Sequence, residues 1–314
     1  MQIENIEKLV GNTPLCKLTC KYKGKVKNVF AKLEWYNLSG SIKDRIALYI
    51  IKKSFEKKLL KKGQDIVEVT SGNTGIAFSA IGGMLGHKVT ILMPEYMSDE
   101  RKSLLRCYGA NLVLLKREEG GFLKGLELAK TFEGAFLPLQ FENDLNRLCH
   151  YETTAVEIVK KLNEKNICPQ AFICGVGTAG TLVGIGDKLK QEYKISVFAL
   201  EPAYSPTLKT GHKVGKHKIE GISDDFVPKI YRRSLVSDIV DITDEEAIFF
   251  AQKLAKIGLG VGISSGANLC GALKLEQDNV VTIFADDNKK YLSTDLFKKV
   301  SLDIDFEVLK IEIL

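Results

Sequence analysis

The sequence lacks the features of a membrane, secreted or metal-binding protein. No apolar run in its 314 residues is long enough to cross a bilayer, and the opening MQIENIEKLV has no signal-peptide pattern. It has only four histidines, which are scattered, and seven cysteines. Cys16 and Cys20 are four residues apart, but no second pair or nearby histidine completes a zinc site. We therefore expect a cytoplasmic protein with no membrane partner and no bound metal.

A large surplus of one charge is also missing. The 45 basic and 39 acidic residues leave a net charge of +6, spread along the chain. The most lysine-rich stretch, KKSFEKKLLKKG (52–63), has leucine and phenylalanine at helical spacing and no accompanying motif of base-stacking aromatic residues. This pattern predicts the solvated outer face of a helix rather than a nucleic-acid surface.

What the sequence does contain is an alternation of short apolar runs with helical patterns. Eight runs rich in β-branched residues predict buried strands at 28–34, 65–70, 88–94, 111–116, 171–176, 196–202, 238–243 and 279–286. Stretches with helical periodicity, such as 45–60, 73–85 and 99–109, lie between most of them. This rhythm predicts an α/β fold of mostly parallel twisted sheets flanked by helices. The length favours two lobes with a cleft between them.

In such a fold, ligands bind where strands end and helices begin. Four turns rich in glycine, serine and threonine have such positions: SGSIKDR (39–45), TSGNTG (70–75), GVGTAGT (175–181) and GISSGAN (262–268). The first places Lys43 where a loop becomes a helix, although the partial positive charge of a helix N-terminus disfavours another cation. Lys43 is therefore either a solvated surface charge or an amine held unprotonated for chemistry.

The turn GVGTAGT allows more than one interpretation. Its three glycines match the G-x-G-x-x-G dinucleotide fingerprint, and Glu201 ends the next expected strand. The loop also suits a phosphate, held by backbone N–H groups at a helix N-terminus with Thr178 and Thr181 as extra donors. No Gly-Lys-Ser/Thr is present, which argues against a nucleoside-triphosphate loop. A phosphate site, a dinucleotide site and a structural turn stay open from this loop alone.

The remaining two turns offer hydroxyl groups. In TSGNTG, Ser71, Asn73, Thr74 and free backbone amides suit a carboxylate, although a helix N-cap would explain one of them. GISSGAN has two serines, for which a capping role is equally plausible. One lysine, one phosphate cradle, one carboxylate cradle and a hydroxyl turn together indicate pyridoxal phosphate, which needs a lysine for a Schiff base and an anchor for its phosphate.

Ordered blocks along nearly the whole chain also carry a family resemblance. They are GNTPL (11–15), SGSIKDR, EVTSGNTGIAFS (68–79), MPEYMSDERKSLLRCYGA (93–110), QFEN (140–143), GVGTAGTLVGIG (175–186), KIEGI (218–222), VGISSGA (261–267) and KYLST (290–294). The sequence resembles the cysteine synthase (O-acetylserine sulfhydrylase) and cystathionine β-synthase family. These are two-lobed, fold type II pyridoxal-phosphate enzymes similar to the tryptophan synthase β-subunit.

The resemblance implies a division of the chain into two domains. A small mobile domain, residues 41–145, would hold the substrate carboxylate, and a large domain, residues 1–40 plus 146–314, would hold the cofactor phosphate. We expect neither an N-terminal haem segment nor a C-terminal regulatory domain. A homodimer is implied as well, whereas docking of a serine acetyltransferase, known in some relatives, stays undetermined.

The resemblance further assigns the site residues. Lys43 would form the imine with pyridoxal phosphate and then move the substrate α-proton. The other cofactor contacts would be Asn73 at the ring oxygen, Ser264 at the ring nitrogen, and Gly177, Thr178, Ala179, Gly180 and Thr181 at the phosphate. The substrate carboxylate would be held by Thr70, Ser71, Asn73, Thr74 and Gln140. The implied reaction is β-replacement or β-elimination on a 3-substituted L-alanine through an aminoacrylate intermediate, which suits the mild electron sink that a serine at the ring nitrogen provides.

Two departures from the family pattern concern the cofactor. Ala179 stands in the phosphate loop where glycine is usual, a change that we expect to be tolerated. FADDN (284–288) replaces the usual P-D/S-S-G, which leaves the surroundings of the ring nitrogen open.

A third departure concerns the substrate. EGISDDF (220–226) resembles the EGIGYDF of cystathionine β-synthases more than the QGIGAGF of plain sulfhydrylases, and HYETTA (150–155) is similar to the first group too. Ser223 and Asp224 match neither group. Asp224 is either a solvated loop charge or a general base in the site that activates water or a thiol and repels hydrosulfide. In the second case we expect L-cysteine as the favoured substrate, with hydrogen sulfide released and L-serine, lanthionine or cystathionine formed.

Other functions stay open alongside this one. An ordinary cysteine synthase would make L-cysteine from O-acetyl-L-serine and sulfide with the same residues. An NAD-dependent oxidoreductase would use the glycine loop and Glu201, but it leaves SGSIKDR and TSGNTG unexplained. A catalytically silent, partner-binding protein on the same fold is disfavoured by the intact Lys43.

Overall fold

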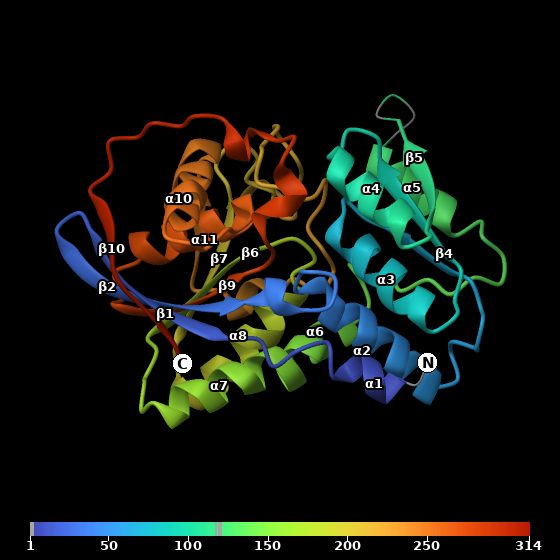
Figure 1. Cartoon of the computed structure of the whole chain (residues 1–314), viewed down its shortest axis with the longest axis horizontal. Coiled ribbons are helices and arrows are strands. Elements are labelled where there is room, and N and C mark those ends of the chain that lie inside the picture. The colour runs from blue at the N-terminus through green and yellow to red at the C-terminus, as the bar shows by residue number, and fades with distance from the viewer. Residues whose placement is uncertain (1–2, 117, 119–120) are drawn as a thin grey trace.

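The computed structural model describes residues 3–116, 118 and 121–314 and contains two sheets, each flanked by helices (Figure 1). The strands are β1 (Leu15–Tyr22), β2 (Lys25–Leu33), β3 (Ile66–Val69), β4 (Val89–Pro94), β5 (Asn111–Leu115), β6 (Ala171–Gly175), β7 (Ser196–Pro202), β8 (Asp238–Ile242), β9 (Asn279–Phe284) and β10 (Phe306–Ile313). The larger sheet has the order β10-β1-β2-β9-β6-β7-β8, and the smaller has the order β3-β4-β5.

Besides α-helices, the described residues include a π-helical turn and several short 3-10 turns. The α-helices are α1 (Ile3–Glu7), α2 (Lys43–Glu56), α3 (Asn73–Met84), α4 (Asp99–Cys107), α5 (Gly121–Ala129), α6 (Leu145–Cys149), α7 (Ala155–Glu164), α8 (Gly180–Tyr193), α9 (Thr207–Thr210), α10 (Asp244–Lys256) and α11 (Ile263–Lys274). The π-helix is η3 (His150–Thr154), and the 3-10 turns are η1 (Glu34–Tyr36), η4 (Arg233–Leu235), η5 (Asn288–Tyr291) and η6 (Asp295–Phe297). No helix among the described residues combines the length and apolar character that crossing a membrane requires.

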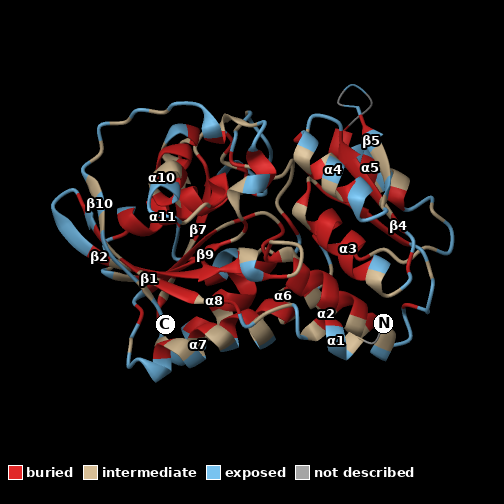
Figure 2. Ribbon diagram, viewed as in Figure 1, coloured by how far each residue is buried: buried red, intermediate tan, exposed pale blue. Residues whose placement is uncertain are grey.

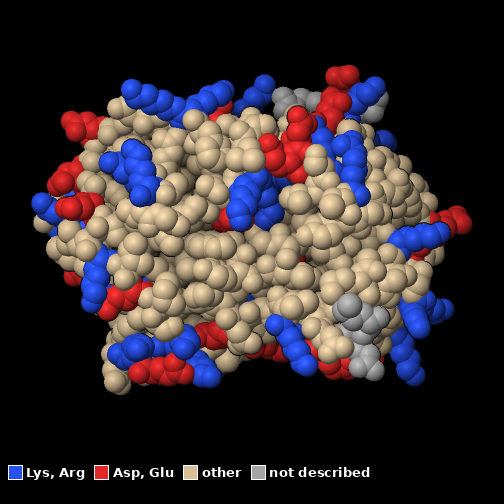
Figure 3. Space-filling model, viewed as in Figure 1, with Lys and Arg blue, Asp and Glu red and all other residues tan. Residues whose placement is uncertain are grey.

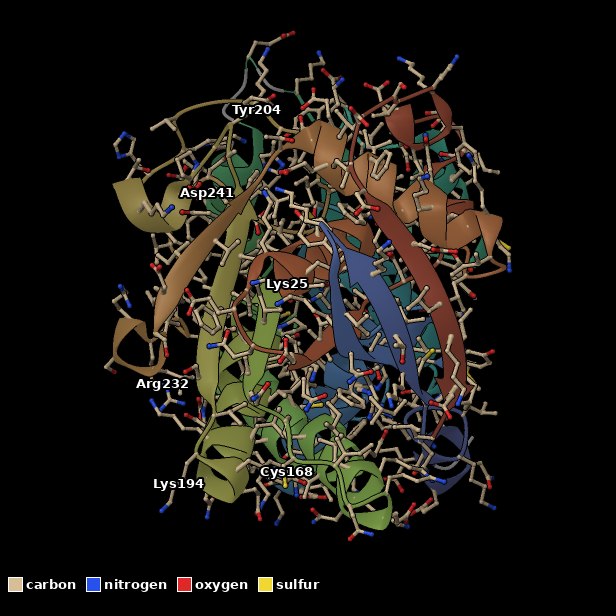
Figure 4. The ribbon with its side chains drawn as sticks, turned by 90° about the vertical axis from the view of Figure 1, so that its left-hand side faces the viewer. Lys25, Cys168, Lys194, Tyr204, Arg232 and Asp241 are labelled. Carbon is tan, nitrogen blue, oxygen red and sulfur yellow. The ribbon has the colours of Figure 1, made fainter. Side chains whose placement is uncertain are left out.

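All eight expected strands occur, and five of them form the parallel part of the larger sheet. Strands β2, β9, β6, β7 and β8 run parallel, whereas β1 pairs antiparallel with β2 and β10. Figure 4 shows these strands side by side, from β8, which carries Asp241, to β10 at the opposite edge. The sequence patterns do not predict β1 and β10. Lys23 and Gly24, both with positive φ, form the tight turn that folds β1 back onto β2.

Helices cover both faces of the larger sheet, which is why its central strands β9, β6 and β7 are mostly apolar. Helices α10 and α11 lie over one face, and α7 and α8 lie over the other (Figures 1 and 2). Successive residues of a strand alternate between two buried clusters: Ile173 belongs to the α10–α11 side, and Phe172 belongs to the α7–α8 side. The sheet is therefore buried on both faces, and its carboxyl edge is where the fold predicts a site.

The smaller sheet is parallel and is also covered on both sides. Its residue Ile91 packs with α2 and α3, whereas the neighbouring Leu92 packs with Phe122 of α5. The predicted two-lobed α/β fold with mostly parallel sheets is thus confirmed. The exact division at residues 41–145 stays a prediction.

Charges are mixed over the surface. On the face that Figure 3 shows, basic and acidic side chains of the described residues are interspersed, both along the edges and in the upper middle. In the lysine-rich stretch, helix α2 ends at Glu56, and Lys52 and Lys53 form ion pairs with Glu7 and Glu56. These pairs accord with the solvated helix face that the sequence predicts.

Candidate active site

Four helices begin around one cavity between the two sheets. Lys43 and Asn73 are the first residues of α2 and α3, Gly180 is the first of α8, and Ser264 is the second of α11. None of these four helices has a side chain that caps its N-terminus. In α2 the first N–H group is already donated, from Lys43 to Ser41 Oγ at 3.3 Å. The partial positive charges of the four helix N-termini nevertheless favour anionic ligands at this position.

The cavity brings together nearly every residue that the sequence singles out. It is lined by Lys43, Thr70, Ser71, Asn73, Thr74, Gln140, Gly177, Thr178, Ala179, Thr181, Asp224 and Ser264. Of the predicted residues, Gly180 alone is not part of the lining. Its lack of a side chain is nevertheless required, because a Cβ there would overlap Asn146 Oδ1. Residues from both lobes meet here although up to 221 positions separate them, from Lys43 to Ser264.

Lys43 has the environment of a neutral amine rather than that of a surface charge. Burial lowers its pKa from 10.5, and the nearby Cys174, Asp224 and Asp286 only partly oppose this shift. Among the described residues, no carboxylate lies within 4.0 Å of its Nζ atom to form an ion pair. Lys43 is therefore suited to attack a carbonyl group.

The rest of the SGSIKDR turn holds Lys43 in place. The buried Asp44 accepts hydrogen bonds from Ser39, at 2.8 Å from the backbone N–H and 2.5 Å from the hydroxyl. Arg45 is clamped by Glu34 at 2.6 Å and by Glu157 at 2.7 Å. These buried contacts fix the start of α2, so that the lysine side chain enters the cavity from a rigid base.

The GVGTAGT turn has the shape of a phosphate cradle. Ala179 has φ +68°, which turns the chain into α8 and leaves the first N–H groups of the helix open. A Cβ at Gly177 would come within 2.5 Å of the carbonyl oxygen of Gly221, so this position requires glycine. The hydroxyl groups of Thr178 and Thr181 border the same space.

Glu201 is not placed to hold the ribose of a dinucleotide. It is fully buried, and it accepts a hydrogen bond of 2.6 Å from the backbone N–H of Leu208 at α9. It does not line the cavity. Glu201 supports α9 instead, so its spacing from the glycine loop does not mark a dinucleotide site.

The TSGNTG turn is a hydrogen-bonded unit in this structure. Thr74 Oγ1 donates to Gln140 Oε1 at 2.6 Å, and Gln140 Nε2 donates to the carbonyl oxygen of Val69 at 2.9 Å. Thr70 Oγ1 accepts from Gly72 N–H at 3.0 Å. Thr74 and Gln140, two of the residues predicted to hold the substrate carboxylate, are therefore hydrogen-bonded to each other. Ser71 borders the cavity beside them.

Asp286, at the end of β9, is a site residue that the sequence reasoning missed. Its Oδ2 atom accepts from Asn73 Nδ2 at 2.7 Å and from the Tyr291 hydroxyl at 2.8 Å. Both Asn73 Oδ1 and Asp286 Oδ1 are buried without a hydrogen-bond partner. The only available signal was the unusual FADDN segment, which contains Asp286.

A second missed group links the two lobes at the cavity wall. Arg101 of α4 is buried, forms an ion pair with Glu220 and stacks 4.8 Å from the centre of the Tyr291 ring. All three side chains line the cavity. Each belongs to a block that the sequence singles out, but nothing in the sequence indicates that the blocks meet.

Asp224 lies in the cavity wall. The preceding Ser223 has φ +55°, and it is fixed by hydrogen bonds of 2.8 Å from its N–H to the Val176 carbonyl and from its hydroxyl to the Ser205 carbonyl. Burial raises the pKa of Asp224 from 3.8 to about 6, with a smaller contribution from Asp225. Lys43 acts in the opposite direction, so the two side chains are close enough to interact electrostatically.

These features fit pyridoxal phosphate. The cofactor requires a reactive amine, a site for a phosphate dianion and polar partners for its ring. The cavity offers Lys43 with a lowered pKa, an uncapped helix N-terminus with two threonine hydroxyls, and Asn73 and Ser264 in its lining. The unpartnered buried oxygen of Asn73 is an acceptor that a ligand would satisfy.

Comparisons with known proteins agree with this geometry. Residues 6–286 match the model of the family described as pyridoxal-phosphate dependent enzyme. A cysteine synthase B of Campylobacter jejuni is 40% identical over 303 residues, which cover 94% of this chain and 98% of that protein. A hydrogen sulfide-producing enzyme of Fusobacterium nucleatum has a solved structure with 49% identity, a TM-score of 0.93 and 99% coverage of both chains.

A variant of that Fusobacterium enzyme has also been solved. It carries an Asp-to-Asn substitution, contains an α-aminoacrylate intermediate and superimposes with a TM-score of 0.94. The predicted family, enzyme class and cofactor are thus confirmed. The chain belongs to the pyridoxal-phosphate dependent enzyme family, and it is similar there to cysteine synthases and to hydrogen sulfide-producing enzymes.

Proposed function

We propose that this enzyme favours L-cysteine, breaks its Cβ–S bond and releases hydrogen sulfide. Water as the second substrate gives L-serine, and a thiol gives a thioether amino acid such as lanthionine or cystathionine. The observation that carries the proposal is the position of Asp224, a carboxyl group in the same cavity wall as Lys43. The similarity to a hydrogen sulfide-producing enzyme supports it.

The proposal gives each predicted residue a task. Lys43 holds the cofactor and afterwards carries the proton of the substrate α-carbon. Once bound, pyridoxal phosphate supplies an electron sink that acidifies this proton and allows the β-substituent to leave. The loop from Gly177 to Thr181 binds the phosphate, and Ser264 faces the ring nitrogen. Ser71 receives the substrate carboxylate together with Thr74 and Gln140, which are hydrogen-bonded to each other.

Asp224 decides the second half of the reaction. With a pKa of about 6, its carboxyl group is mostly ionised at pH 7 and is able to take a proton from water or from a thiol as either attacks the β-carbon. The same negative charge repels hydrosulfide. Release of sulfide is therefore favoured over its re-addition, which is the step that makes cysteine.

Movement of residues 41–145 as a small domain belongs to the same proposal. Opening would break contacts between α4 and the opposite lobe, namely the Arg101–Glu220 ion pair and the 2.8 Å hydrogen bond from the Ser293 hydroxyl to Glu100. These two polar contacts would break when the domain opens to admit the substrate, and they would form again when it closes.

The alternative, synthesis of L-cysteine from O-acetyl-L-serine and sulfide, has one observation in its favour. The Campylobacter relative, whose match covers 94% of the present chain, is a cysteine synthase. The same cavity residues would serve that reaction, because only the leaving group and the nucleophile differ.

The test compares sulfide release from L-cysteine with cysteine formation from O-acetyl-L-serine plus sulfide, with products identified by mass spectrometry. We expect release to dominate in the wild-type enzyme and to fall as the pH decreases through about 6, because Asp224 becomes protonated. Asp224→Asn should lower kcat for release by about 10²-fold, a typical contribution of a general base.

Asp225→Asn is the matched control. Asp225 adjoins Asp224 in the chain but forms an ion pair with Lys213 at 2.5 Å. It should leave kcat nearly unchanged. Equal sulfide release by the Asp224→Asn variant and the wild type, or faster synthesis than release in the wild type, would refute the proposal.

A further inference from the structure

The two threonines of the phosphate loop each have a polar partner behind them. Asn146 Nδ2 donates to Thr178 Oγ1 at 2.9 Å, and His150 Nε2 lies 3.2 Å from Thr181 Oγ1. Asn146 and His150 are four residues apart in the continuous helical segment formed by α6 and η3, so they share one face. We call this pair, Asn146 and His150, the donor layer.

The direction of the Asn146 amide follows from its second partner. Its Nδ2 atom also lies 2.8 Å from the carbonyl oxygen of Gln140, which is only able to accept. The NH₂ group must therefore face both Gln140 and Thr178. Thr178 accepts one of these protons, which leaves its own hydroxyl proton available to a ligand in the cavity.

His150 needs a different argument, because a neutral imidazole has one donor and one acceptor nitrogen. The ring is fully buried, and burial, Lys43 and Arg45 hold its pKa well below 6.5, so it is neutral at pH 7. Its Nδ1 atom lies 3.0 Å from Thr154 Oγ1. One of the two threonines must donate to the ring, and the other must accept from it.

We propose that the donor layer orients both loop hydroxyls toward the cofactor phosphate, with His150 in its Nε2–H tautomer. In that state Thr154 donates to Nδ1, Nε2–H donates to Thr181, and the Thr181 hydroxyl proton points into the cavity. The opposite tautomer would direct the hydroxyl proton of Thr181 to the ring and present its lone pairs to a dianion. The inference rests on the proposed role of residues 177–181 as the phosphate loop, but not on the choice of L-cysteine.

The packing of α8 indicates that this contact is built rather than incidental. A Cβ at Gly180 would overlap Asn146 Oδ1, and a Cβ at Gly184 would lie 2.8 Å from the Cβ of His150. Both positions need glycine for α8 to approach the segment this closely. The segment becomes a π-helix from His150 onward, a rare conformation that is frequent at functional sites.

The test separates phosphate recognition from ring recognition. Full-length protein is freed of cofactor and titrated with pyridoxal phosphate and with pyridoxal, and the ratio of the two affinities is measured. His150→Gln places an amide where it reaches Thr181, whereas His150→Asn places the same group near Thr154 only. We expect His150→Asn to reduce the ratio by about tenfold or more, the effect of one lost hydrogen bond to a charged group. His150→Gln should retain most of it.

The control is His87→Gln, which removes another buried histidine. The Nδ1 atom of His87 lies 2.7 Å from the Gln64 carbonyl oxygen in the other lobe, and we expect no change in the ratio. Equal ratios for His150→Asn, His150→Gln and the wild type would overturn the donor layer alone. A wild-type enzyme with no preference for pyridoxal phosphate over pyridoxal would overturn the phosphate loop itself.

A second measurement reads the tautomer in the wild-type holoenzyme and uses a variant only to assign the signal. The chain has only four histidines, so ¹⁵N NMR of the histidine-labelled holoenzyme resolves them, and the spectrum of the His150→Gln variant assigns His150. We expect shifts of a neutral ring protonated at Nε2. A ring protonated at Nδ1, or at both nitrogens, would overturn the proposal.

Discussion

Replacing Glu68 with glutamine is expected to stabilise the protein at neutral and alkaline pH. Glu68 lies in β3 with 3% of its surface exposed, and it accepts from Val69 N–H at 2.9 Å and from Gln140 N–H at 3.4 Å. No basic side chain among the described residues pairs with it. Burial therefore raises its pKa from 4.5 to about 8, and the two backbone hydrogen bonds oppose this shift only in part.

The magnitude follows from proton linkage. Between pH 4.5 and pH 8 the carboxyl group is protonated in the folded protein and ionised in the unfolded chain, so unfolding releases a proton. The free energy of unfolding then decreases by about 1.4 kcal/mol for each pH unit gained. Carried from pH 4.5 to pH 7, the loss is about 3 kcal/mol. Glutamine does not titrate, and it keeps an acceptor for Val69, so it removes this dependence.

The assay is urea unfolding of the wild type and Glu68→Gln at pH 5, 6, 7 and 8. The two stability curves should nearly meet at pH 5 and diverge steadily, with the variant more stable by about 1–3 kcal/mol at pH 7. The upper limit requires that the new NH₂ group does not clash with the N–H of Gln140. Parallel curves across this range would refute the reasoning, because they would mean that Glu68 has the same pKa in both states.

Two further changes test the site walls. Ala179→Gly should raise stability by about 1 kcal/mol or less in thermal unfolding, since alanine at φ +68° is strained; a clear loss would mean that the packing of its methyl group outweighs the strain. Arg101→Met should lower the free energy of unfolding by about 2 kcal/mol, because it leaves Glu220 unpaired at the cavity wall. Adding Glu220→Gln to that variant should restore part of the loss in urea unfolding, and strict additivity would argue against a direct ion pair.

Local sequence patterns were sufficient for the parallel strands and the turns that follow them. A strand buried on both faces is rich in apolar and β-branched residues, and on this pattern the five parallel strands of the larger sheet and the three of the smaller one were all predicted. Strands β1 and β10 were not, because their residues alternate between the core and solvent or lie at an exposed edge. Their pairing joins the two ends of the chain, and no local pattern encodes that.

The residues of the candidate site also fall into those that local sequence patterns predict and those that they do not. Lys43, the loop at 177–181 and the turn at 70–75 were found from the sequence because residue type and position after a strand determine what they offer a ligand. Asp286, Arg101 and His150 were missed as site residues because their role depends on distant partners. Asp286, for example, meets Asn73 from 213 residues away.

For Asp224, part of the answer came from the sequence and part from the tertiary structure. The sequence by itself determined that a carboxyl group stands in the segment EGISDDF, and it left open whether that group is solvated or lies in the site. Only the tertiary structure decided that Asp224 lines the cavity. Its place in the cavity wall depends on the preceding Ser223, which has a positive φ and donates hydrogen bonds to the carbonyl oxygens of Val176 and Ser205. These two residues follow β6 and β7 in the chain and come near Asp224 only through folding of the larger sheet. Side-chain direction in a loop depends on such long-range contacts, which are absent until the chain has folded.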